Sequence, residues 1–129
     1  MIKKTLFLLT SLLFIACSNE PNEEQQVAQA VENYYEMFLK SNFEGYVNGF
    51  DISTNAPHLY KIQLVANAKM YAKQIREEHK GILKAMADSV KIADNKQEAN
   101  VFMSILFADS LKETVLVPMI KREEEWKMR

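Results

Sequence analysis

Hydrophobic residues recur at helical spacing in the first part of the chain. Between residues 23 and 40 they follow one another at intervals of three and four, in the series Val27, Val31, Tyr34, Tyr35 and Phe38. This interval places the side chains on one face, so the pattern predicts an amphipathic helix. A second, shorter helix is predicted after residue 41, because the same intervals separate Phe43, Tyr46, Val47 and Phe50.

A third helix is predicted from Pro57 to about Lys80, after a polar break at residues 53–56. Proline is tolerated in the first turn of a helix, and Gly81 directly after Lys80 is typical of a helix end. One row of apolar residues on this helix is expected to face the core: Leu59, Ile62, Ala66 and Met70. Further apolar residues should widen this row, namely Val65, Ala72 and Ile75.

After Gly81 the apolar period changes to two, which is the spacing of a β-strand. Val90 and Ile92 alternate with polar neighbours before a turn at residues 95–96. Apolar residues then alternate over residues 99–107, and the opposite face of this segment also carries Phe102 and Leu106. The pattern therefore predicts a central strand that is covered on both sides.

Two more strands complete the predicted sheet. A turn at Asp109 and Ser110 leads into a strand over residues 114–120, and a turn at residues 123–125 leads into a short last strand at residues 126–128. Pro118 cannot donate a ladder hydrogen bond, so its end of the third strand should be an edge or a bulge. Helices followed by an antiparallel sheet predict an α+β fold with one core over residues 24–129.

Three stretches of the chain resemble the NTF2-like superfamily, in the lumazine-binding-like branch of small bacterial lipoproteins. They are "SNFEGYVNGF", "KGILKAMADSVKIADNKQEANVFMSILFADS" and "VPMIKREEEWKM". The resemblance implies a cone, in which three N-terminal helices pack on a curved four-stranded antiparallel sheet and a pocket opens at the wide end. It implies no activity, because the superfamily contains isomerases, cyclases, dehydratases and non-catalytic binding modules.

Residues 1–16 have the layout of a secretory signal peptide. Two lysines precede an apolar run at residues 6–16, which is shorter than the ~20 residues of a membrane-spanning helix. The run ends in the letters FIAC, which resemble the lipobox of bacterial lipoproteins. This resemblance implies cleavage between Ala16 and Cys17 and attachment of lipid, such as a diacylglyceryl group and palmitate, to Cys17. The alternative is a buried N-terminal helix that carries the cysteine.

Residues 17–23 are polar and acidic and contain Pro21, so we expect a flexible tether between lipid and domain. Acidic residues directly after the cysteine also resemble the surface-export signal of Bacteroidetes lipoproteins, and a plain soluble tether is the alternative. The membrane is thus an expected partner through the lipid anchor. The expected location is the cell envelope, at the outer membrane, with the periplasmic and the surface face both left open.

Composition excludes several classes of function. Sixteen basic and seventeen acidic residues give a net charge of −1, so no surface for nucleic acid is predicted. The one cysteine excludes an internal disulfide framework and a multi-cysteine zinc site. Three widely separated glycines do not make a phosphate-binding loop. We therefore expect no metal and no cofactor.

Three titratable residues are candidates for catalysis in a cone pocket: His58, His79 and Asp51. General acid–base chemistry needs such a group inside the pocket with a pKa near the working pH. His58 lies near a helix start and is expected at the surface, while His79 in a last helical turn suits the helix dipole. Asp51 at a helix end is expected to cap or to be solvated. The domain is therefore predicted to be non-catalytic.

Aromatic and sulfur-containing residues are candidates to line a binding pocket, and the favoured alternative is that they fill it. These residues are Tyr34, Tyr35, Tyr46, Phe50, Met70, Met103 and Trp126. On the outer face of the sheet, apolar residues predict a homodimer: Phe102, Leu106, Leu116 and Ile120. The sequence thus predicts a module that binds a small apolar ligand or a protein partner. An enzyme of the isomerase or cyclase type and a structural assembly subunit are the alternatives.

Overall fold

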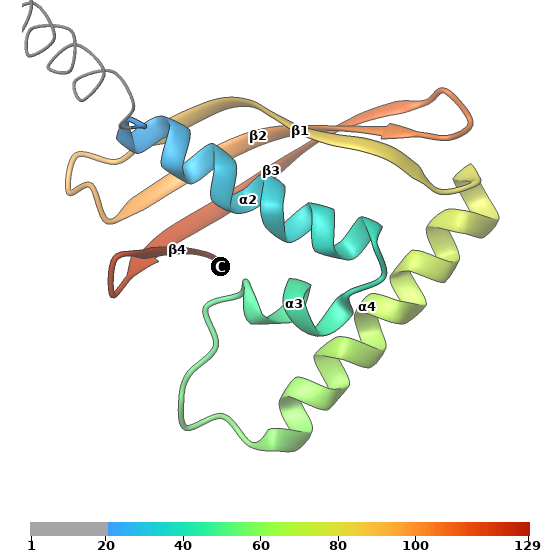
Figure 1. Ribbon diagram of the computed structural model, residues 1–129, viewed down its shortest axis with the longest axis horizontal. Coiled ribbons are helices and arrows are strands. Elements are labelled where there is room, and N and C mark those ends of the chain that lie inside the picture. Colours follow the sequence, from blue (N-terminus) through green and yellow to red (C-terminus); the bar gives the residue numbers. More distant parts are fainter. Residues whose placement is uncertain (1–20) are drawn as a thin grey trace, which may run out of the picture.

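The structure, a computed structural model, describes residues 21–129. Within this range the chain forms the elements α2 (Glu23–Leu39), α3 (Phe43–Asn48), α4 (His58–His79), β1 (Ile82–Ile92), β2 (Glu98–Phe107), β3 (Lys112–Arg122) and β4 (Glu125–Met128). The predicted order of helices followed by strands is confirmed (Figure 1). Cys17, the expected cleavage site and the expected signal peptide at residues 1–16 lie outside the described residues.

Asn22 fixes the start of α2. Its side chain accepts a hydrogen bond from the backbone N–H of Gln25 at 2.8 Å, and its own N–H donates to the Gln25 side chain at 3.0 Å. This reciprocal capping box satisfies N–H groups that have no partner inside the helix. Glu23 and Glu24 in the first turn suit the positive end of the helix dipole. The helix therefore begins inside the range expected as a tether, residues 17–23, because Asn22 is its cap and Glu23 its first residue.

The four strands form one antiparallel sheet in the order β1-β2-β3-β4, which curves over α2 (Figure 1). The register pairs Met103 with Val115 on the inner face and Phe102 with Leu116 on the outer face. In the turns between strands, Lys96, Ser110 and Glu123 adopt positive φ. Asn95 and Asp109, which directly precede Lys96 and Ser110, are typical turn residues, so the local sequence predicted these two turns.

Pro118 lies where β3 loses one neighbour. β4 pairs with β3 only from Met119 to Arg122, and the carbonyl of Pro118 accepts a hydrogen bond from the N–H of Arg129 at the end of the pairing. The N–H and the carbonyl of one residue point the same way in a strand, so the missing donor of Pro118 faces the side on which β4 stops. The prediction that this end of the strand is an edge or a bulge is wrong, because Met119 and Ile120 pair with β2 on one side and with β4 on the other. The unpaired edge of β3 lies on the N-terminal side of Pro118.

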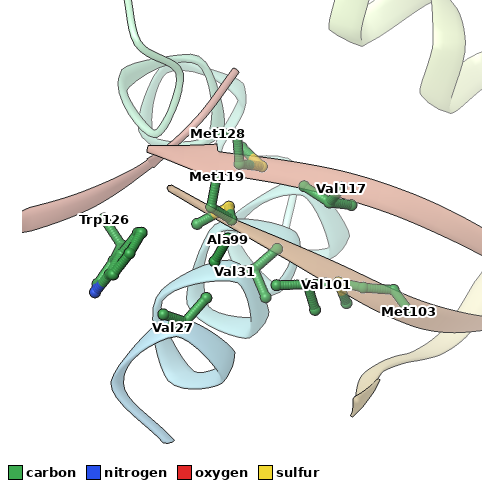
Figure 2. Close-up of a cluster of buried hydrophobic side chains, with 9 residues drawn as sticks. All are labelled: Val27, Val31, Ala99, Val101, Met103, Val117, Met119, Trp126 and Met128. Carbon is green, nitrogen blue, oxygen red and sulfur yellow. The ribbon is translucent and has the colours of Figure 1, made fainter. Parts of the chain in front are cut away.

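The core lies between α2 and the inner face of the sheet. Val27 and Val31 of α2 are fully buried against Val101 and Met103 of β2 and Met119 of β3 (Figure 2). Burying a side chain of this size contributes about 1.5–3 kcal/mol. A second cluster closes the other end of the molecule and consists of Phe38, Ala68, Ala72, Ile75, Ile105 and Phe107.

The predicted core face of α4 is partly wrong. Ala72 and Ile75 are buried as expected, together with Ala68. The row from Leu59 to Met70 instead faces out, with Leu59 75% and Met70 70% exposed. Both rows repeat every three or four residues but follow different sides of the helix, so periodicity could not decide which one packs. In Figure 1 the first half of α4 diverges from the sheet.

The prediction that β2 is covered on both sides is also wrong for the described residues. β2 is central, because it pairs with both β1 and β3. Its outer face nevertheless leaves Phe102 42% and Leu106 36% exposed. All three helices lie on the concave side or pack against each other, so no described element covers the convex side.

Candidate functional site

Aromatic side chains fill most of the space expected for a pocket inside the cone. The Tyr35 and Tyr46 rings meet edge to face at 6.0 Å, and Phe50 meets Tyr46 in the same way at 5.2 Å. The remaining cavity measures about 50 Å³ and has Tyr71 and Glu113 at its wall. Small-molecule sites commonly measure ~300–1,000 Å³, so this cavity is too small for a ligand beyond water size.

The structure separates the residues expected to line that pocket. Tyr35 and Tyr46 border the small cavity. Met103 and Trp126 belong to the core, whereas Met70 points to solvent, so the prediction for Met70 is wrong. Phe50 packs on the core and also borders an open hollow on the outside.

Desolvation determines the chemistry of the buried tyrosines. Burial raises the pKa of Tyr46, and the neighbouring Tyr35 and Tyr71 add to the shift. Burial also raises the pKa of Tyr35. Both phenols therefore stay neutral at physiological pH.

His79 and Asp109 join the end of α4 to the β2–β3 hairpin. The Nδ1 atom of His79 lies 2.8 Å from the Oδ2 atom of Asp109, and the imidazole stacks on the Phe107 ring at 4.3 Å. The hydrogen bond with His79 lowers the pKa of Asp109. The pair is partly buried and lines none of the large hollows that the structure describes, so its position is that of a structural contact.

Asp51 lies on the wall of an open hollow of about 900 Å³. Its two carboxylate oxygens accept hydrogen bonds from Arg122 at 3.1 and 3.2 Å, and this pairing raises the pKa of Arg122. His58, the first residue of α4, lies exposed at the same hollow. Asp51 and His58 thus lie at the same hollow, and His79 lies elsewhere.

A second hollow of about 470 Å³ runs between α3 and α4, and we call it the α3–α4 groove. Apolar residues from both helices form its surface, and lysines of α4 stand beside it; the lining consists of Glu44, Val47, Asn48, His58, Lys61, Ile62, Val65, Ala66 and Lys69. Asn48, His58 and Lys61 also line the 900 Å³ hollow, so the two hollows meet there. No local sequence pattern indicates this groove, because it depends on how two helices lie relative to each other.

The described residues contain neither a metal site nor a membrane span by the usual criteria. No three histidine, cysteine, aspartate or glutamate side chains among residues 21–129 gather as ligands for a metal ion. In the same part of the chain, none of the helices combines the length and hydropathy that a membrane crossing requires.

No family model and no curated protein matches the sequence. Solved structures do match the fold. A protein from Campylobacter jejuni described as an NTF2-like transpeptidase is 16% identical, with a TM-score of 0.55 over 76% of this chain and 92% of that chain. At this identity the match shows the fold alone, which is that of the NTF2-like α+β proteins.

Two other solved structures are less similar. The protein Aln2 from a Streptomyces species is 13% identical, with a TM-score of 0.48 over 81% of this chain and 83% of that one. A protein from Xanthomonas campestris described as a calcium/calmodulin dependent protein kinase II association domain is also 13% identical, with a TM-score of 0.43 over 76% of both chains.

Proposed function

We propose that this chain, whose fold is NTF2-like, is a lipid-anchored envelope protein with a non-catalytic binding domain that takes its ligand in the α3–α4 groove. One observation carries the binding role. Among residues 21–129, the cavity beside the buried tyrosines measures about 50 Å³, while an apolar groove of about 470 Å³ lies open between α3 and α4. The second volume falls within the range of small-molecule sites, and the first does not.

The candidate catalytic groups support a binding role over an isomerase or cyclase. Such enzymes need an acid or base that is held inside a pocket with its pKa matched to the reaction. The carboxylate of Asp51 is occupied by Arg122, and His79 by Asp109. His58 is exposed at the surface of α4.

The anchor is proposed from residues 14–17, and a single substitution tests it. Two acyl chains hold a protein on a bilayer stably, since each buried CH₂ contributes about 0.8 kcal/mol. We expect Cys17→Ser to move the protein from the membrane fraction to the soluble fraction of its own cells. In cells grown with radioactive palmitate, we expect the variant protein to carry no label. Retention of the variant in the membrane fraction, as for the wild type, would show that the anchor is wrong.

Binding in the groove is tested with the neutral fluorescent probe N-phenyl-1-naphthylamine. We expect Ala66→Trp to fill the groove and reduce the fluorescence gain of the probe, because Ala66 lies in the lining. Gln74→Trp is the matched control, since Gln74 is exposed on the same helix outside the lining. Equal probe binding by the two variants would contradict a binding site at this place.

A protein partner is the second candidate, and the outer face of the sheet favours it. Phe102 and Leu116 lie opposite each other on β2 and β3 and are 42% and 54% exposed. Exposed apolar patches of this kind mark interaction sites. A homodimer or a larger assembly would use this face and leave the α3–α4 groove open.

A further inference from the structure

We infer that the α3–α4 groove takes a single-chain amphiphile with an anionic head, of which a free fatty acid is the simplest. This inference rests on the proposed function of the groove as a binding site. The acyl chain would lie along α4 between Ile62 and Ala66, and the carboxylate would lie at the end of the groove that is marked by His58 and Lys61.

The apolar part of the groove fits an acyl chain. Its apolar lining consists of Val47 of α3 together with Ile62, Val65 and Ala66 of α4. Ile62 is 51% exposed, so apolar surface remains to be buried by a ligand. Burial of such surface is the main driving force for binding an unbranched hydrocarbon chain.

Charge distinguishes the two ends of the groove. His58 and Lys61 are three residues apart on α4, so they are neighbours on its surface. They line the part where the groove meets the larger hollow, together with Asn48. Glu44 and Lys69 line the groove but not the larger hollow, and their charges offset each other. The end at Lys61 is therefore the one that favours an anion.

Lys61 is available for a ligand, unlike Arg122 and Lys127, the other Lys and Arg residues that line the larger hollow. Arg122 is paired with Asp51 at 3.1 Å, and Lys127 is paired with Glu125 at 3.5 Å. Among the residues that the structure describes, Lys61 has no carboxylate oxygen within 4.0 Å. A ligand carboxylate at this end would give Lys61 an ionic partner while its chain covers Ile62.

Three probes with the same chain separate the head group from the chain: laurate, dodecanol and dodecylamine. Each is titrated against the full chain carrying Cys17→Ser, at concentrations below micelle formation, by displacement of N-phenyl-1-naphthylamine. Because every protein compared carries Cys17→Ser, any probe binding by residues outside the described range contributes equally to all of them. We expect laurate to bind most tightly, dodecanol less tightly and dodecylamine least.

Lys61→Gln is expected to weaken laurate binding by about fivefold, the effect of losing one exposed ion pair, and to leave dodecanol binding unchanged. Lys73→Gln is the matched control, because Lys73 is exposed on α4 outside both hollows.

Two results separate failure of this inference from failure of the proposed function. Equal binding of laurate and dodecanol, or an unchanged preference for laurate in Lys61→Gln, would overturn the inference that the groove prefers an anionic head group at Lys61. The groove would remain a binding site. The groove would not be a binding site if none of the three probes displaced N-phenyl-1-naphthylamine and if Ala66→Trp bound this dye as well as Gln74→Trp does. Binding of laurate only when it is incorporated in phosphatidylcholine vesicles would also overturn the inference, because the ligand proposed is a free amphiphile.

Discussion

Single side chains of α2 attach the helix to both edges of the sheet. The Glu32 carboxylate accepts a hydrogen bond from the N–H of Ala87 in edge strand β1 at 3.0 Å. The hydroxyl of Tyr34 donates to the carbonyl of Trp126 in β4 at 2.8 Å. A strand at a sheet edge has backbone groups without a neighbouring strand, and polar side chains from a packed helix can satisfy them.

Gly49 shows how closely α3 approaches α2. A Cβ atom built on Gly49 would lie 2.5 Å from the Tyr34 ring. The backbone there is ordinary right-handed helix, with φ −76°, so glycine is required by the contact and not by the conformation. This close approach brings the aromatic residues of α3 onto the core, where they fill the cone.

Asp109 makes stability dependent on pH. The hydrogen bond with His79 places its pKa in the folded protein below the unfolded value. The contribution is therefore present above the unfolded-state pKa and is lost as pH falls through the folded-state pKa. We expect Asp109→Asn to lower the free energy of unfolding at neutral pH, and this difference from the wild type to shrink as the solution is acidified.

Urea unfolding followed by circular dichroism between neutral and strongly acidic pH measures this difference. Asp94→Asn is the control, since Asp94 is exposed in the turn between β1 and β2. If the free energy of unfolding of Asp109→Asn stays below that of the wild type by a constant amount across the acidic range, the Asp109 carboxylate is not the source of this pH dependence.

At the scale of elements, α4 has two apolar rows, and the structure packs one of them. Ile75 is 6% exposed in the second core cluster, whereas Met70 on the same helix is 70% exposed. We expect Ile75→Ala to cost about 2–5 kcal/mol, the range for truncating a buried side chain. Met70→Ala should change the free energy of unfolding by about 0.5 kcal/mol or less, as for an exposed position. Urea denaturation of both variants is the measurement, and equal costs would mean that the Met70 row is packed.

The elements themselves were predictable because their signals are local. Alternation over residues 99–107 and polar turn residues such as Asn95 and Asp109 predict strands and turns from neighbours in the sequence alone. The packed row of α4 depends on where the helix meets α3 and β1, which no local pattern contains. The α3–α4 groove was missed for the same reason, although the apolar Ile62 beside Lys61 was a visible sign of a mixed surface.

At the scale of the whole molecule, the two faces of the sheet differ in how far they are covered. The helices close the concave side of the sheet and leave the convex side without a cover from the described residues (Figure 1). The α3–α4 groove lies on the helical side. The proposed ligand binding in the groove and the proposed protein contact on the sheet would therefore use different surfaces.

The convex face predicts a dimer in solution. Phe102 and Leu116 are opposite each other in the register, and Leu106 lies further along β2, so two copies can bury these side chains against one another. Multi-angle light scattering of residues 21–129, which keep the Asn22 cap, is expected to give the mass of a dimer at high micromolar concentration.

Leu116→Lys should convert this dimer to a monomer, because pairing two copies would then bury two like charges at the contact. Leu111→Lys should leave the dimer intact, since Leu111 is similarly exposed, at 58%, but lies in the β2–β3 turn and not on the sheet face. Circular dichroism of both variants checks that each is folded. A wild-type domain that is strictly monomeric, or a dimer that survives Leu116→Lys, would mean that the convex face is not the contact between copies.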